Sequence, residues 1–409
     1  MKITQTTLLL FLLISASAPL AKSADFDSGS NGSYGAMNIT ANTTLDLPAD
    51  GKFHCTTISV AQGAILTFKR NALSTPVYLL AQGDVTINGT IDVSGGNAIY
   101  GDPKGGLGGP GGFDGGRAGN ASDVGAGSGY GPGAGKRGDN TGGVTNAGSG
   151  SYASKSQNDS IKNHGETYGS PLLVPLVGGS GGGGIVIPIS QGPVGGGGGG
   201  GGGAILIASR TRIVFGDTGS VYANGGYGTK FGFSGYFNNH GSGGAIRLVA
   251  PNITGRGSLK ADPFVPSFTN LRYAGSGRIR VDSLDRDDVK LTFSPYSVST
   301  VGSAMFVFPN KIPRLDIVEA AGNAIAEGTS SAVQFLLPLA SPTTQTVKVQ
   351  ARDFSALVKI NVVLTPEFGD PIVYPAQIDN KANNPAVVEV PVVVPVNTVV
   401  TINAWTRKD

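Results

Sequence analysis

Residues 77–96 read VYLLAQGDVTINGTIDVSGG, and a similar pattern returns at residues 204–226 (AILIASRTRIVFGDTGSVYANGG) and 245–262 (AIRLVAPNITGRGSLKAD). Each copy holds three short apolar runs and no helical periodicity. A unit of about 20 residues cannot bury its own apolar face, whereas stacked copies bury one continuous core. The repeat therefore predicts an all-β fold built on a short parallel β-helix. The alternative is an antiparallel sandwich in which the similarity is coincidental.

The copies share two small features. The first apolar run of each copy ends in an alanine, at Ala81, Ala208 and Ala250. The third run begins at a glycine and continues x-apolar-x-small, as in GTIDV and GSVYA. Glycine at such points lets the backbone turn sharply between two faces. A weaker copy lies at residues 58–68, and a last strand is expected at residues 277–281.

Long insertions leave the repeat at one equivalent point. Residues 97–203 follow the first copy and return through a run of nine glycines, residues 195–203. Shorter loops follow the second copy at residues 227–244 and the third at residues 263–277. Equivalent exits in stacked repeats lie on one side of a solenoid, and insertions on one face often form its binding surface.

The insertion at residues 97–203 is mainly Gly, Ser, Asn and Asp. Two structures are open to it. It has little apolar surface to offset its ordering entropy and would then be a flexible brush. Alternatively, its oligoglycine runs pack as extended, polyproline-II-like strands. Two apolar stretches within it, SPLLVPLV at residues 170–177 and IVIPI at residues 185–189, are expected to dock on the β-helix and pin the insertion.

The first 23 residues have the pattern of a secretory signal peptide. Lys2 precedes seven apolar residues at 8–14, and Ala21-Lys22-Ser23 resembles a cleavage site. Seven apolar residues cannot cross a bilayer that needs about 20. We therefore expect no transmembrane segment after signal removal. The mature protein is expected to be secreted or on the cell surface, with the periplasm as the alternative.

The composition excludes several classes of partner. Charged residues are 14% of the chain and the net charge is +3, which predicts no nucleic-acid partner. Three histidines and one cysteine leave little material for a transition-metal site, so no cofactor is expected. Residues 108–114 (GGPGGFD) resemble one calcium-binding nonapeptide that is not iterated, which leaves calcium open. The lone Cys55 is expected to be a buried thiol.

The composition changes after about Lys290, where glycine thins out and valine and proline rise. Short strands are expected at residues 345–352, 357–364, 386–394 and 399–405. Such strands with turn signals between them predict a small β-sandwich over residues 314–409. The expected organisation is a signal peptide at residues 1–23, the β-helix at 24–290 with its Gly-rich insertion at about 97–203, and the sandwich at 314–409.

Five stretches carry a resemblance to a known class of protein. They are residues 83–96 (GDVTINGTIDVSGG), 108–116 (GGPGGFDGG), 200–205 (GGGGAI), 241–251 (GSGGAIRLVAP) and 277–282 (GRIRVD). Through them the chain resembles glycine-rich secreted bacterial parallel β-helix (pectin-lyase-like) surface proteins over about residues 40–285. The resemblance implies an adhesive or structural role at a bacterial surface. The same fold is shared with pectin-degrading enzymes, and a fold does not fix a function.

Catalytic groups are sparse in the sequence. A polysaccharide lyase or hydrolase needs acidic residues in a groove and a basic residue or second carboxylate beside them. The adjacent pair Asp287 and Asp288 lies in a polar turn, and no aspartates accompany His240 or Arg278 in a recognisable motif. The sequence therefore favours a non-enzymatic protein, with an enzyme acting on an acidic polysaccharide as the alternative and a purely structural coat element as a third hypothesis.

Aromatic residues in the shorter loops are the candidate binding residues. Exposed rings stack on sugar faces or anchor a protein partner. The leading hypothesis is a surface protein that binds a polysaccharide, another glycan or a surface protein through this loop face. The candidate residues are Tyr227, Phe231, Phe233, Tyr236, Phe237, His240, Tyr273 and Arg278, with Phe264 and Phe268 in the third loop.

Overall fold

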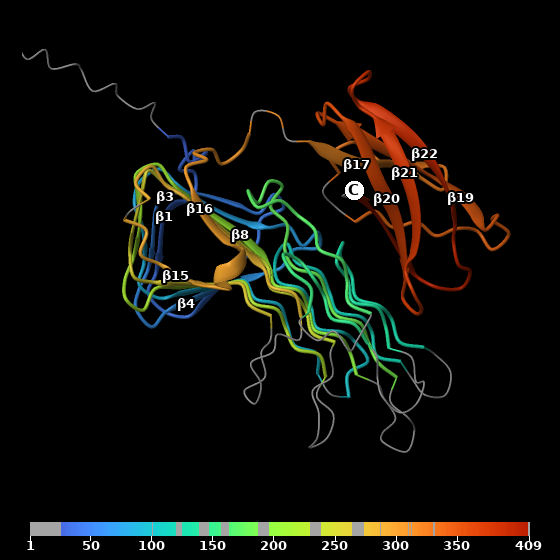
Figure 1. The fold of residues 1–409 in the computed structure, drawn as a ribbon, viewed down its shortest axis with the longest axis horizontal. Coiled ribbons are helices and arrows are strands. Elements are labelled where there is room, and N and C mark those ends of the chain that lie inside the picture. The colour runs from blue at the N-terminus through green and yellow to red at the C-terminus, as the bar shows by residue number, and fades with distance from the viewer. Residues whose placement is uncertain are drawn as a thin grey trace, which may run out of the picture.

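The structure is a computed structural model, and Figure 1 shows its ribbon. It describes residues 26–99, 101–119, 125–138, 147–156, 163–186, 196–229, 239–263, 274–286, 288–309, 311, 313–329 and 332–407. Regular elements within these residues are strands, apart from the short 3-10 helix η2 (Tyr296–Val298). The protein is all-β, as the sequence predicts.

Each copy of the repeat supplies three strands in the same order. The first two strands of a copy join one sheet and the third joins another. The strands are β5 (Val77–Ala81), β6 (Val85–Ile87) and β7 (Thr90–Asp92) in the first copy, β8 (Ala204–Ser209), β9 (Arg212–Phe215) and β10 (Ser220–Tyr222) in the second, and β11 (Ala245–Val249), β12 (Asn252–Gly255) and β13 (Ser258–Lys260) in the third.

Every pairing between copies is parallel, so the chain returns to the same two sheets at each turn. Strands β5, β8 and β11 pair in sequence, as do β6, β9 and β12, and β7, β10 and β13. The antiparallel alternative is therefore wrong for this part of the chain. Further strands extend the sheets at both ends: β1 (Gly35–Ile39), β2 (Thr43–Asp46), β3 (Lys52–Val60) and β4 (Ile65–Lys69) before the repeats, and β14 (Arg278–Asp282), β15 (Thr292–Ser294) and β16 (Ser299–Gly302) after them.

The register corrects one detail of the repeat alignment. Ala208 lies opposite Leu80 and Val249, whereas Ala81 lies opposite Ser209. Successive side chains of a strand point to opposite faces. A shift of one residue therefore turns Ala208 toward the outer face of its sheet, while Ala81 points to the inner core.

The stacked strands bury apolar side chains on two faces. The inner cluster contains Ile, Leu and Val side chains from both sheets, and the buried Cys55 packs within it as predicted. Burial raises the pKa of the Cys55 thiol to about 11, which makes it a poor nucleophile. On the outer face, Leu173 and Leu176 join a second cluster with Leu206. Residues 170–177 thus dock on the strands as expected.

The C-terminal residues form two antiparallel sheets around a buried cluster of their own. Their strands are β17 (Arg314–Ala320), β18 (Asn323–Ala324), β19 (Thr344–Arg352) and β22 (Ala386–Val393) in one sheet, and β20 (Leu357–Pro366), β21 (Ile372–Asp379) and β23 (Val400–Thr406) in the other. Four of these strands match the predicted ones within two residues. The sequence pattern does not predict β17, β18 and β21, whose residues are mostly exposed or half-buried.

Candidate functional site

Glycine-rich segments between the repeats run side by side, in the teal to yellow part of Figure 1. The run at residues 196–203 lies inside this array, and its backbone N–H groups donate in three directions. Residues three apart donate to the same neighbouring segment, at residues 93–96, 113–116 or 239–242. A polyproline-II helix has three residues per turn, so successive N–H groups point about 120° apart. The period of three in these hydrogen bonds is the period of that helix.

Carbonyl groups of the same run accept from three more segments, at residues 106–109, 179–185 and 226–229. Six segments therefore enclose the run, three as acceptors and three as donors. The second central run, residues 178–185, is enclosed in the same manner by residues 113–119, 127–130, 135–138 and 196–202, Gly148 and Ser242. We call this hydrogen-bonded array the glycine lattice.

The spacing of the glycine lattice requires glycine. A Cβ atom added at Gly201 would lie 2.0 Å from the carbonyl oxygen of Gly179, and one at Gly200 would lie 2.1 Å from that of Leu107. Both distances are far below van der Waals contact, so a row with side chains cannot pack this closely. The second alternative for the insertion, packed extended strands, is therefore the one found in its described parts.

The lattice is joined to the stacked strands at equivalent points. The last glycine of each segment that returns to the repeat donates its N–H to the residue directly after the third strand of the preceding copy. These bonds run from Gly203 to Val93, from Gly244 to Ala223 and from Gly277 to Ala261, at 2.7 to 2.8 Å. The predicted common exit of the insertions is confirmed.

Several segments lie side by side at the side of the lattice away from the strands. Gly119 donates to Ile185, Ile185 donates to Gly196, and Thr229 donates to Gly197, at 2.8 to 3.1 Å. We call this side of the lattice, away from the strands, the open end and define it by the hydrogen-bonded neighbours Gly119, Gly138, Val186, Gly196, Thr229 and Asn239.

Two of the predicted binding residues lie close to the open end. Tyr227 is 37% exposed, and its backbone pairs with Asn97 and Ala98 in a neighbouring lattice segment. His240 is completely buried and its Nδ1 accepts a hydrogen bond from the N–H of Gly228 at 3.0 Å. Tyr227 is thus partly exposed, whereas His240 holds two lattice segments together.

Burial also determines the charge of His240. Desolvation lowers its pKa from 6.5 to about 3, so the imidazole is neutral near pH 7. Because Nδ1 is a hydrogen-bond acceptor, the proton of the neutral ring is on Nε2. The side chain is a structural acceptor in the lattice and carries no charge to a ligand.

Arg278 lies at the other end of the lattice, where β14 begins. Its Nη2 donates to the carbonyl oxygen of Tyr168 at 3.0 Å, and its guanidinium lies 5.5 Å from the ring centre of Tyr152. The structure therefore separates Arg278 from the open end. The remaining candidates lie outside the described residues: Phe231, Phe233, Tyr236, Phe237, Phe264, Phe268 and Tyr273.

The sequence does not predict a buried ionic cluster formed by Arg247, Arg280 and Asp282. Arg247 in β11 is 1% exposed, lies 3.5 Å from the carboxylate of Asp282, and donates to the carbonyl oxygen of Phe306 at 2.8 Å. Asp282 also accepts from Arg280 and from the N–H of Ala304. The cluster fixes residues 304–306 on the outer face of the sheet. The side chain of Arg247 faces this covering segment and not solvent. The alternation of apolar residues in β11 does not predict that its outer face is covered.

The acidic residue of the calcium-like stretch has a different partner. Asp114 forms a two-pronged ion pair with Arg70 and accepts from the N–H of Gly108 at 2.7 Å. Its carboxylate therefore closes a turn of the lattice. Among the residues that the structure describes, no group of three or more His, Cys, Asp or Glu side chains could hold a metal ion.

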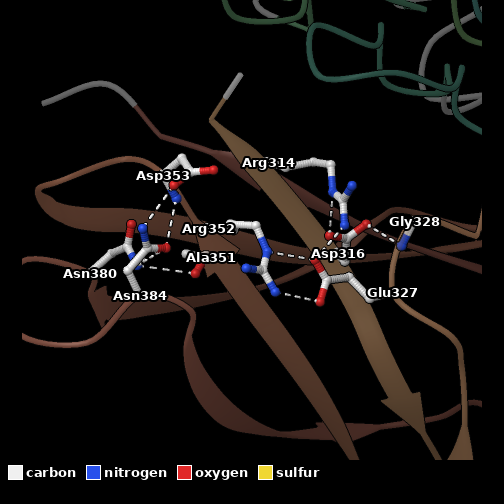
Figure 2. Close-up of polar contacts among 9 residues, drawn as sticks. All are labelled: Arg314, Asp316, Glu327, Gly328, Ala351, Arg352, Asp353, Asn380 and Asn384. Carbon is white, nitrogen blue, oxygen red and sulfur yellow. Dashed lines mark hydrogen bonds and ion pairs between the residues drawn. The ribbon is translucent and has the colours of Figure 1, made fainter. Parts of the chain in front are cut away.

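Figure 2 shows a polar network in the C-terminal sheets. Glu327 accepts from Arg352 at 2.6 and 2.8 Å and from Arg314 at 2.6 Å. Hydrogen bonds from Arg352 and then Gln350, with a smaller effect of the charge of Arg314, lower the pKa of Glu327 to about 2. Nearby, Asn380 accepts from the N–H groups of Phe354 and Ser355 and ties down their turn. Because these side chains bond to one another, the network stabilises the fold of the C-terminal sheets.

No family model, no curated protein and no solved structure matches the chain. Within the described residues, no helix has the length and apolar character needed to cross a membrane.

Proposed function

We propose that the chain is an exported bacterial surface protein that binds glycans or other surface components through the open end of the glycine lattice. In this proposal the stacked strands are a short parallel β-helix that carries the lattice, and the C-terminal sheets are a small β-sandwich. The single observation that supports it most is the convergence of lattice segments at the open end. Loops on a rigid scaffold are a common design of binding surfaces.

The lattice suits this role because it is held by its backbone. The run at residues 196–203 is bonded to six neighbouring segments and has no side chains to rearrange. Segments anchored in this way lose little further freedom when a ligand binds, which favours affinity. Residues 230–238 connect Thr229 with Asn239 and contain four of the predicted aromatic residues.

The proposal is tested by binding to immobilised cellulose, chitin, alginate and polygalacturonate. Replacing Tyr227, Phe231, Phe233, Tyr236 and Phe237 together by serine should weaken binding to the recognised polysaccharide at least tenfold, or about 1.4 kcal/mol. The matched control is Tyr296→Ser, a ring that is 80% exposed on η2, away from the lattice. Equal binding by both variants, or none by the parent chain, would count against the proposal.

The same samples separate binding from catalysis. Reducing ends are measured for each polysaccharide with calcium and with a chelator. Steady release from one substrate would favour the alternative, an enzyme acting on an acidic polysaccharide.

A further inference from the structure

The C-terminal unit, residues 314–407, is attached to the lattice by its backbone. In the loop between β20 and β21, Gly369 donates its N–H to the carbonyl oxygen of Ala126 at 3.2 Å, and Gly127 and Gly369 form a parallel bridge. A Cβ atom at Gly127 would lie 2.6 Å from the carbonyl oxygen of Glu367. Residues 367–370 therefore pack against residues 125–129 as one more row of the lattice.

Side chains on both sides of this row are complementary. Arg117 bonds to the carboxylate of Glu367, and its guanidinium lies 4.7 Å from the ring centre of Phe368. Arg137 lies 3.4 Å from the carboxylate of Asp370. Arg117 and Arg137 of the lattice thus pair with the two acidic residues of the segment Glu-Phe-Gly-Asp at residues 367–370.

One aromatic pair completes the contact. The ring of Phe113 in the lattice lies 5.5 Å from that of Trp405 in β23, edge to face. Trp405 is the single tryptophan of the chain, so its fluorescence reports whether the C-terminal unit is docked.

The docked unit has the properties of a part that can separate without unfolding. Its buried cluster is its own and includes no residue of the stacked strands or of the lattice. Its ion pairs are 32 to 58% exposed at the side chains. Pairs this exposed are worth about 0–1 kcal/mol each. The chain enters the unit through residues 307–313, just beyond the segment that Arg247 holds.

We propose that residues 125–129, with Arg117 and Arg137, are an exchangeable docking site that also takes residues 367–370 of a second copy of this chain. An exchanged unit makes the same contacts as its own unit, so exchange is a low-cost route to assembly. Crowding of copies on a surface would favour it by mass action. The docking site adjoins the open end, where a Cβ atom at Gly119 would lie 2.5 Å from the amide nitrogen of Ala126, and its test measures chain mass and Trp405 emission instead of ligand binding.

Charge reversal tests it with the full mature chain. Arg117→Glu and Glu367→Arg each place like charges against each other within one copy. When the two variants are mixed, each lattice meets an opposite charge only on the other copy. We expect each variant alone to have the mass of one chain and a Trp405 emission shifted to the red and readily quenched by acrylamide.

The mixture should give a species of twice that mass, with Trp405 emission returned to that of the parent. The double variant Arg117→Glu with Glu367→Arg is the control and should restore docking within one copy. A mixture that keeps the mass of one chain, while the double variant restores the emission, overturns the proposal. If either single variant loses its far-UV circular dichroism, the same design is applied to Arg137 and Asp370, with the same two outcomes.

Discussion

The glycine lattice and the stacked strands hold adjacent parts of one chain by opposite means. The strands bury Ile, Leu and Val side chains, and apolar area removed from water stabilises them by about 25 cal/mol per Å². The central lattice rows are almost entirely glycine and are held by buried backbone hydrogen bonds in several directions. Glycine loses more conformational freedom on folding than any other residue, so these bonds have more entropy to offset. An added side-chain atom therefore destabilises the glycine lattice, whereas a removed side-chain atom destabilises the stacked strands.

The largest effect is expected from Gly201→Ala. Its Cβ would lie 2.0 Å from the oxygen of Gly179, and the nearest atoms are all backbone of Gly179 and Ser180, so the clash is relieved only by separating two rows. Overpacking in a well-packed core costs about 1–3 kcal/mol and occasionally more. We expect Gly201→Ala to lower the free energy of unfolding by at least about 3 kcal/mol. Calorimetric unfolding measures the loss, and amide hydrogen exchange locates it in the lattice.

A matched glycine separates this clash from a general effect of alanine. A Cβ atom at Gly125 would meet only the end of the flexible Arg137 side chain, at 3.1 Å. Gly125→Ala should therefore change the unfolding free energy by less than about 0.5 kcal/mol. Equal effects at Gly125 and Gly201 would contradict the account of the lattice as a sterically closed array.

The same contrast explains which parts of the fold could be predicted from sequence. Apolar alternation in the three copies predicts β5, β8 and β11 because burial of alternate side chains creates that pattern. A glycine run has no side-chain pattern, so it is compatible with both a brush and a packed array. Only the positions of its hydrogen-bond partners, which are distant in sequence, distinguish the two.

The candidate site was predictable to a similar extent. Equivalent exits from the repeat place the insertions on one side, and the three bonds into Val93, Ala223 and Ala261 confirm this. The chemistry of His240 and Arg278 predicts a role in binding, yet in the structure both side chains join segments of the fold. The sequence contains no local signal for the Phe113 and Trp405 contact, because 292 positions separate the two residues.

The second prediction concerns how the stability of the lattice depends on pH through the buried His240. The folded state holds His240 neutral with a pKa of about 3, whereas the unfolded chain binds its proton near pH 6.5. Its contribution to stability is fully present above pH 6.5 and is lost as the pH falls toward 3. Between pH 7 and pH 5 this amounts to about 2 kcal/mol. His240→Asn, which keeps an acceptor for Gly228, should remove that part of the pH dependence.

The measurement is unfolding by denaturant at several pH values, followed by circular dichroism. His54 is the natural control, because it lies half-exposed in β3, outside the lattice. His54→Asn measures what a histidine-to-asparagine exchange does to stability outside the lattice. A slope that survives unchanged in His240→Asn would contradict the assignment of the titrating group to His240.

The third prediction changes one methyl group in the strands, as Gly201→Ala does in the lattice. Ile207 in β8 is completely buried in the inner cluster. Ile→Val in a core typically costs about 0.5–1.5 kcal/mol, because neighbours relax partly into the space. Calorimetry on Ile207→Val should therefore show a smaller loss than on Gly201→Ala. The opposite order would mean that the lattice rows move apart more easily than the packed strands close a gap.

The smallest effect is expected from Glu327→Gln, which lies in neither region. Its carboxylate is exposed to solvent and bound by Arg314 and Arg352, so the amide keeps part of the hydrogen bonding and loses only screened charge attraction. Because its pKa is lowered from 4.5 to about 2, the carboxylate contributes stability above pH 4.5 and loses it as the pH falls through 2. Glu327→Gln should thus be slightly less stable than the parent at pH 7, and the two should converge at pH 2. Trp405 fluorescence follows unfolding of the C-terminal unit in both chains, and a difference that grows on acidification would show that Glu327 is not held as a carboxylate.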